Sequence, residues 1–131
     1  LNQGYVRLSQ SVNIAFGATL VSEEEIFVPP GCRIVGFTVD VLTVFNSATS
    51  ATLSAGITSG ATTYMGGVDV KAATGRIAPT YTAAQLAKMS GQSLLGVADL
   101  IPGPLFLTVT SVGQPTAGYI TVDVEYVQLP V

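Results

Sequence analysis

The sequence contains no histidine, no tryptophan and a single cysteine, and only 10% of its 131 residues are charged. Without histidine, the chain lacks the most common general base near neutral pH, the serine–histidine–aspartate triad and the usual zinc ligand. Cys32 cannot form an intrachain disulfide, and no partner base is visible that would make it a nucleophile. We therefore interpret it as a small buried apolar side chain.

Charge is scarce, and the basic residues form no cluster. The net charge is −3, and the five basic residues are scattered along the chain: Arg7, Arg33, Lys71, Arg76 and Lys88. Because a phosphate backbone is bound by clustered cations, we expect no nucleic-acid partner. No apolar run approaches the roughly 20 residues of a membrane-spanning helix, so we expect no membrane partner. The hydrophobic content of 48% excludes an intrinsically disordered chain.

Apolar and polar residues alternate with a period of two, which is typical of strands with one buried face. In the longest run, residues 33–45, the predicted buried face carries Val35, Phe37, Val39, Val41 and Phe45. In the last run, residues 117–129, it carries Ile120, Val122, Val124 and Tyr126. Further strands are predicted at residues 5–9, 12–16, 25–28, 52–57, 62–70, 93–97 and 105–110, with Leu53, Ala55 and Ile57 on one face of the fourth of these.

A single short helix is predicted at residues 83–89, with Thr82 as its N-cap, Gly91 as its C′ glycine, and packing through Leu86 and Met89. One short helix cannot supply the crossovers of a parallel sheet.

Strand signals at intervals of about 8 to 12 residues indicate an all-β, antiparallel β-sandwich of about eight strands. We expect one domain over residues 1–131, with residues 1–22 as an N-terminal arm or edge strands. Residues 113–118 are predicted to link the last two strands as a short hairpin-like loop. The segment from Leu1 to Phe16 lacks the basic start and apolar block of a signal peptide.

Candidates for chemistry are few. Asp40 and Asp123 lie on the polar faces of the two longest predicted strands, and would approach each other if those strands pair. A glycosidase uses two carboxylates at a defined separation, so the pair could be catalytic. We favour the alternative that both are solvent-facing charges on the strands. The run from Glu23 to Glu25 is interpreted as a solvated loop ahead of a strand, with binding of a cation or a basic partner as the alternative. We expect no enzyme, no catalytic residue, no metal site and no cofactor.

Three stretches of the chain together resemble small β-sandwich virion proteins of tailed bacteriophages. They are residues 27–46 (FVPPGCRIVGFTVDVLTVFN), 50–56 (SATLSAG) and 64–69 (YMGGVD), and the closing VDVEY at 122–126 is similar to the terminal strand of such proteins. The resemblance implies a non-enzymatic, jelly-roll-like particle component that is often trimeric. It further implies a capsid decoration (cement) protein, a head fibre or a tail-associated domain, made in the host cytoplasm and located in the virion.

We therefore expect a capsid decoration protein that forms a homo-oligomer, with a trimer favoured, and binds a major capsid protein on the capsid surface. Scarce surface charge fits this expectation, because neutral surface is buried against neighbours at low desolvation cost. The interface candidates are Tyr5, Leu42, Phe106 and Tyr119, with a second layer of core as their alternative role. The alternative function is a receptor- or glycan-binding domain of a head or tail fibre, with its site in loops such as 58–63 or 113–118.

Overall fold

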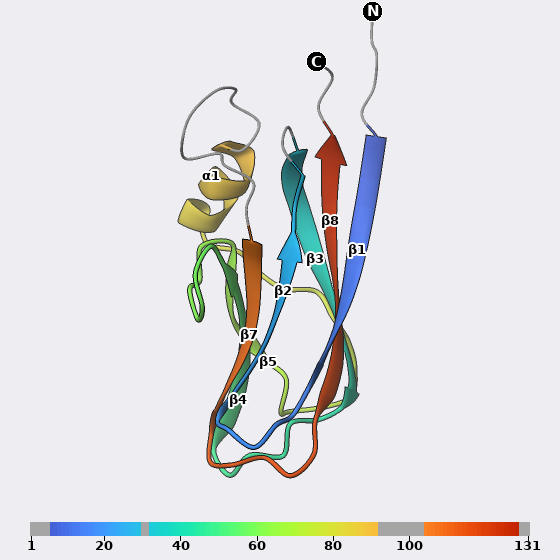
Figure 1. Cartoon of the computed structure of the whole chain (residues 1–131). Helices are drawn as coiled ribbons and strands as arrows, with labels where there is room; N and C mark the ends of the chain where they lie inside the picture. Colours follow the sequence, from blue (N-terminus) through green and yellow to red (C-terminus); the bar gives the residue numbers. More distant parts are fainter. Residues whose placement is uncertain (1–5, 30–31, 92–103, 129–131) are drawn as a thin grey trace, which may run out of the picture.

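The computed structural model describes residues 6–29, 32–91 and 104–128, which form two packed β-sheets and one helix (Figure 1). The elements of the described residues follow one another along the chain as β1 (Val6–Ala15), β2 (Val21–Phe27), β3 (Cys32–Thr43), β4 (Ser50–Gly56), β5 (Met65–Asp69), β6 (Gly75–Ile77), α1 (Ala83–Gly91), β7 (Pro104–Val112) and β8 (Tyr119–Gln128). The prediction of an all-β sandwich with one short helix is confirmed.

The two sheets have the jelly-roll arrangement. One sheet has the strand order β1-β8-β3-β6 and the other β2-β7-β4-β5, and every pair is antiparallel. The first strand therefore pairs with the last, the second with the seventh, the third with the sixth and the fourth with the fifth, as when a long hairpin is rolled up. The predicted hairpin between the last two strands is wrong, because β7 and β8 belong to different sheets and bury their apolar faces against each other across the core.

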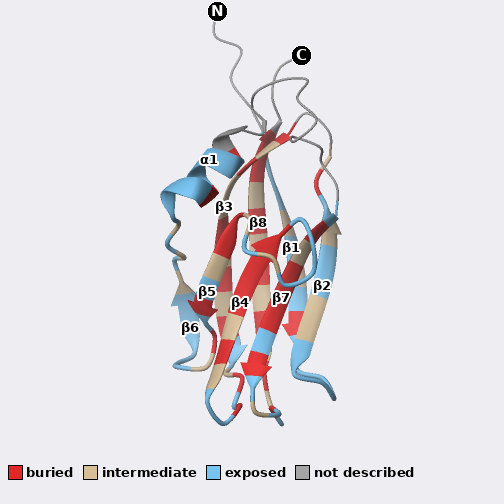
Figure 2. Ribbon diagram, turned by 90° about the vertical axis from the view of Figure 1, so that its left-hand side faces the viewer, coloured by how far each residue is buried: buried red, intermediate tan, exposed pale blue. Residues whose placement is uncertain are grey.

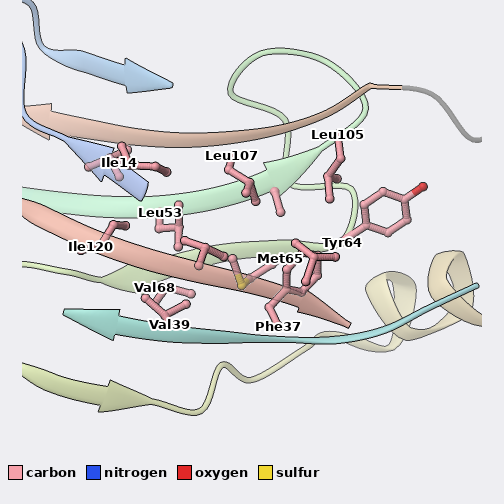
Figure 3. Packing of buried hydrophobic residues seen from close by; sticks show 14 of the residues in the cluster. Ile14, Phe37, Val39, Leu53, Tyr64, Met65, Val68, Leu105, Leu107 and Ile120 are labelled. Carbon is pink, nitrogen blue, oxygen red and sulfur yellow. The ribbon is translucent and has the colours of Figure 1, made fainter. Parts of the chain in front are cut away.

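The core lies between the inner faces of the two sheets (Figures 2 and 3). Every second residue of β8 is buried, as the alternation predicts, and β7 buries Leu105, Leu107 and Val109 in the same way. The largest fully buried side chains are Phe45, Ile14, Ile34, Leu53, Met65, Leu107, Ile120, Val39, Val41, Val70, Val109 and Val122. Among the described residues, the buried side chains form one hydrophobic cluster between the sheets.

Two irregularities in β3 change which residues face the core. The register against β8 shifts between Ile34 and Gly36, so Val35 is the extra residue and Ile34 is buried in its place. The prediction that Val35 lies on the buried face is therefore wrong, although the alternation from Phe37 to Val41 is confirmed. The second shift falls between Val41 and Thr43, which makes Leu42 the extra residue there. A simple period of two contains no signal for either inserted residue.

The observed strand boundaries differ from the predicted ones where pairing between strands overrides the local sequence pattern. The two short strands predicted at residues 5–9 and 12–16 are one strand, β1, because β8 offers ten consecutive partners from Val6↔Gln128 to Ala15↔Tyr119. The run from Glu23 to Glu25, predicted as a loop, lies in β2 and pairs with β7. Ile57 is 55% exposed and follows the end of β4, so it does not share the buried position of Leu53 and Ala55, with which the alternation groups it. The strand predicted at residues 93–97 lies outside the described residues.

The helix begins with a reciprocal cap. The Gln85 backbone N–H donates to the Thr82 hydroxyl (3.2 Å), and the Thr82 backbone N–H donates to the Gln85 side-chain oxygen (2.9 Å). Met89 packs into the core, whereas Leu86 is 49% exposed, so only half of the predicted packing is right. The second buried position is Gln85, one turn before Met89, and its amide donates to the Thr62 carbonyl (3.0 Å). The helix extends through Gly91 rather than ending before it.

Candidate interaction surfaces

Two of the predicted interface residues, Leu42 and Tyr119, lie close together at one end of the β1-β8-β3-β6 sheet. Tyr119 begins β8 and pairs with Ala15 on one side and Thr43 on the other. Leu42 is the extra residue of the adjacent bulge, where it is 58% exposed, and Tyr119 is half-buried. The exposure of Leu42 excludes a role in a second layer of core. Regular alternation already places Leu42 on the polar outer face, and the bulge leaves its apolar side chain exposed there.

Phe106 lies on the other sheet, so the predicted interface residues do not form one surface. It is half-buried on the outer face of β7, opposite Glu25 of β2 and Gly56 of β4. Its diagonal neighbour across the β2–β7 pair is Phe27, which is 60% exposed and which sequence reasoning missed. Tyr5 lies outside the described residues.

Asp40 and Asp123 do lie near each other, as expected if their strands pair. Asp40 is opposite Thr121 and Asp123 is opposite Thr38, so the carboxylates are diagonal neighbours on the outer face of β3 and β8. Each has a partner within the chain. Arg76 of β6 donates to both oxygens of Asp40 (2.8 and 3.3 Å), and this hydrogen bonding holds the pKa of Asp40 below its usual range. Asp123 accepts a hydrogen bond from Ser11.

Cross-strand pairing continues over the rest of this outer face. Arg7 forms an ion pair with Glu125 (3.3 Å), and the Thr121 hydroxyl donates to the Asn13 side-chain oxygen (2.9 Å). These pairs follow the β1–β8 register, in which Arg7 and Glu125 are two residues out of direct opposition and Asn13 and Thr121 face each other directly. The polar groups of this face are thus joined to one another across the strands, as a solvent-facing sheet surface requires.

On the outer face of the opposite sheet, Glu23 holds a loop. The Thr108 hydroxyl of β7 donates to the Glu23 carboxylate (2.9 Å) and accepts from the backbone N–H of Gly60 (3.1 Å), and the Ser59 hydroxyl also donates to Glu23. The loop between β4 and β5 therefore folds back over β7 and leaves Thr108 only 1% exposed (Figure 2). The interpretation of Glu23 as a solvated loop residue is wrong. Nothing in the sequence marks Thr108, because outward-facing threonines are ordinary in strands.

Two shallow grooves lie near the edges of the sandwich. One, of about 560 Å³, runs between α1 and the loop that Glu23 holds, and is lined by Ile57, Thr62, Thr63, Thr82, Ala84, Gln85 and Lys88. The other, of about 440 Å³, is lined by residues between Gly66 and Thr80, most of them glycine, alanine and threonine. Asp40 and Asp123 line neither groove. Among the described residues, no three histidine, cysteine, aspartate or glutamate side chains gather as metal ligands would.

Cys32 begins β3 and is buried, and burial raises the pKa of its thiol. A raised pKa keeps the sulfur protonated and unreactive near neutral pH, in agreement with the apolar role that the sequence suggests.

No helix among the described residues has the length and apolarity to cross a membrane. No family model, curated protein or solved structure matches this chain. Its function is therefore argued from the chain's own surfaces.

Proposed function

We propose that this chain is a structural protein of a bacteriophage virion, and specifically a capsid decoration protein that binds an assembled shell and stabilises it. In this proposal it acts as a homo-oligomer, with a trimer favoured, and its second partner is the major capsid protein. The resemblance of its sequence to small β-sandwich virion proteins suggests the class. Its jelly-roll fold is one that viral capsid domains use, among others.

The observation that carries the proposal is the outward placement of large apolar side chains on the described strands, outside the buried core. Phe27 and Leu42 are 60% and 58% exposed, although twelve other large side chains fill the interior. Exposed apolar side chains that the core does not need are available to a partner. On the β1-β8-β3-β6 sheet, which carries Leu42, the charges of Asp40–Arg76 and Arg7–Glu125 are already paired within the chain. A neighbouring protein surface that covers these pairs need not supply partners for them.

The test uses particles of the phage that encodes the chain, assembled with its gene deleted. We expect the purified protein to bind these shells saturably in co-sedimentation and to raise the temperature of shell disruption in calorimetry. Phe27→Ser and Leu42→Ser are expected to weaken binding. Leu86→Ser, at a comparably exposed position on α1, serves as the matched control. The proposal would be contradicted if native particles do not contain the chain and the purified protein does not bind shells assembled without it.

A receptor- or glycan-binding domain of a fibre is the second candidate, and one observation favours it. The groove beside the 58–63 loop presents Thr62, Thr63, Gln85 and Lys88, which are hydrogen-bonding groups suited to a sugar. A glycan array or a host-cell adsorption assay with the isolated chain separates the two functions. Specific adsorption that is lost in Thr63→Val, with no binding to shells, would favour the fibre.

A further inference from the structure

One end of the sandwich carries almost no charge. Three loops meet there, residues 16–20 between β1 and β2, 44–49 between β3 and β4, and 113–118 between β7 and β8 (Figure 1, bottom). None of them contains an aspartate, glutamate, lysine or arginine. The fourth loop at this end, residues 70–74, adds the single charge of Lys71. We call these four loops, with the adjoining strand residues Val21 and Val112, the loop end.

Exposed apolar side chains collect on the loop end. Four of the nine large hydrophobic residues that the described part of the chain exposes lie there: Phe16 (43%), Leu20 (48%), Val21 (45%) and Val112 (53%). Backbone bonds join the segments that carry them. Phe16 donates to the Gly118 carbonyl (3.0 Å), and Ser111 donates to the Leu20 carbonyl (2.8 Å). The segments that carry these side chains are therefore neighbours at one end of the sandwich.

The loops of this surface are fixed in place by their own hydrogen bonds. The Asn46 side-chain oxygen accepts from the backbone N–H groups of Thr116 (2.8 Å) and Ala117 (3.0 Å), and its amide donates to the Thr116 hydroxyl (2.9 Å). The Gln114 amide donates to the Gly17 carbonyl (2.8 Å), which ties the last loop to the first. A surface that is ordered before binding loses little conformational entropy when a partner covers it.

We propose that the loop end is a self-association surface, at which one copy of this chain meets another. In a symmetric assembly, a patch that lies at the symmetry axis meets its own copies, so a patch of like charges would repel itself. The outer face of the β2-β7-β4-β5 sheet has this defect, since Glu23, Glu25 and Asp69 all lie in its strands. The loop end carries no such group of like charges, and its apolar side chains can pack against the same side chains of a second copy.

Self-association through the loop end leaves both sheet faces exposed. The first residue of β1, Val6, pairs with the last residue of β8, Gln128, so both strands terminate at the far end of the sandwich. The inference deepens the proposed function by naming the surface that makes the oligomer, but its test needs no shell.

The test measures mass in solution by light scattering and sedimentation over a series of protein concentrations. We expect the wild-type chain to reach a multiple of 13.4 kDa. The Leu20→Glu/Val112→Glu double variant is expected to dissociate at least about 100-fold more readily, because its carboxylates would be buried without partners. Leu86→Glu, at a comparably exposed position on α1, is expected to keep the wild-type mass. Circular dichroism and thermal melting establish that each variant is folded.

A second measurement needs no variant. Hydrogen exchange of the wild-type chain at high and low concentration should show concentration-dependent protection within residues 16–20 and 113–118. A wild-type chain that stays monomeric at every concentration, or protection confined to other segments, would overturn the inference. A monomer that still binds shells removes this inference and leaves the proposed function intact. An oligomer that forms through the loop end but binds no shell supports this inference and contradicts the proposed function.

Discussion

Thr108→Val tests whether one threonine hydroxyl holds the loop between β4 and β5 on the outer face of its sheet. The hydroxyl donates to Glu23 and accepts from the Gly60 backbone N–H. Valine has nearly the same shape, so the substitution removes two hydrogen bonds and opens no cavity in a site that is 1% exposed. Glu23 keeps its bond from Ser59, so its charge is not left without a donor.

The expected loss follows from those two bonds. Each contributes a net ~0.5–1.5 kcal/mol, so Thr108→Val should lower the free energy of unfolding by about 2 kcal/mol. For a domain of this size, that loss corresponds to a fall in Tm of roughly 6–10 °C. The effect should be local as well as global, because the Gly60 amide loses its acceptor and should exchange with solvent faster.

The assay combines chemical denaturation with hydrogen exchange at Gly60. Thr108→Ser is the matched control, since it keeps the hydroxyl and removes only the methyl group. Some stability is lost in this control, but the Gly60 amide should stay protected. Unchanged Gly60 exchange in Thr108→Val, or a loss of stability within about 0.3 kcal/mol, would show that the loop is held by other contacts.

Three further substitutions address separate parts of the fold. The pKa of Asp40 is lowered in the folded chain, so the stability that its bond to Arg76 contributes is present above about pH 4 and is lost as the pH falls further. Equilibrium unfolding at several pH values should therefore show a flatter curve of stability against pH in this range for Asp40→Asn than for the wild-type chain. Gly118→Ala should cost about 1–3 kcal/mol, because a Cβ there would lie 2.6 Å from the Phe45 ring, and a double-mutant cycle with Phe45→Leu should recover part of the loss. Gln85→Ala removes the side-chain half of the reciprocal cap and the bond to the Thr62 carbonyl, and should lower stability by about 1–2 kcal/mol, seen as faster exchange of the α1 amides.

The sandwich could be predicted from the sequence because β3 between Phe37 and Val41, and β8 between Ile120 and Tyr126, bury every second residue. The pattern fails where an extra residue is inserted. At Val35 and Leu42, β3 shifts against β8, and the side chains that face the core depend on the register with a strand more than 70 residues away. The three-residue strand β6 was missed for a different reason, since it is too short to show alternation and pairs only over Val39 to Val41 of β3.

The candidate surfaces were predicted less well, because outward-facing residues are selected by contacts that the local pattern does not contain. Leu42 and Tyr119 do meet at one end of a sheet, but Phe106 lies on the other sheet, where its neighbour Phe27 was overlooked. Glu23 was interpreted from its charged neighbours, whereas its position is set by Thr108, 85 residues further along the chain. Such long-range contacts follow from the jelly-roll connection and not from sequence proximity.

The pairing of β8 with both β1 and β3 determines the order in which the protein can fold. During synthesis, residues 6–15 leave the ribosome long before residues 119–128, which are their partners in their own sheet. The β2-β7-β4-β5 sheet likewise waits for β7, so neither sheet is complete before the strands at residues 104–112 and 119–128 have been made. Such non-local closure makes folding slow and leaves unpaired strand edges exposed in the meantime. A nascent chain of this kind is expected to depend on chaperones more than a helical protein of equal length.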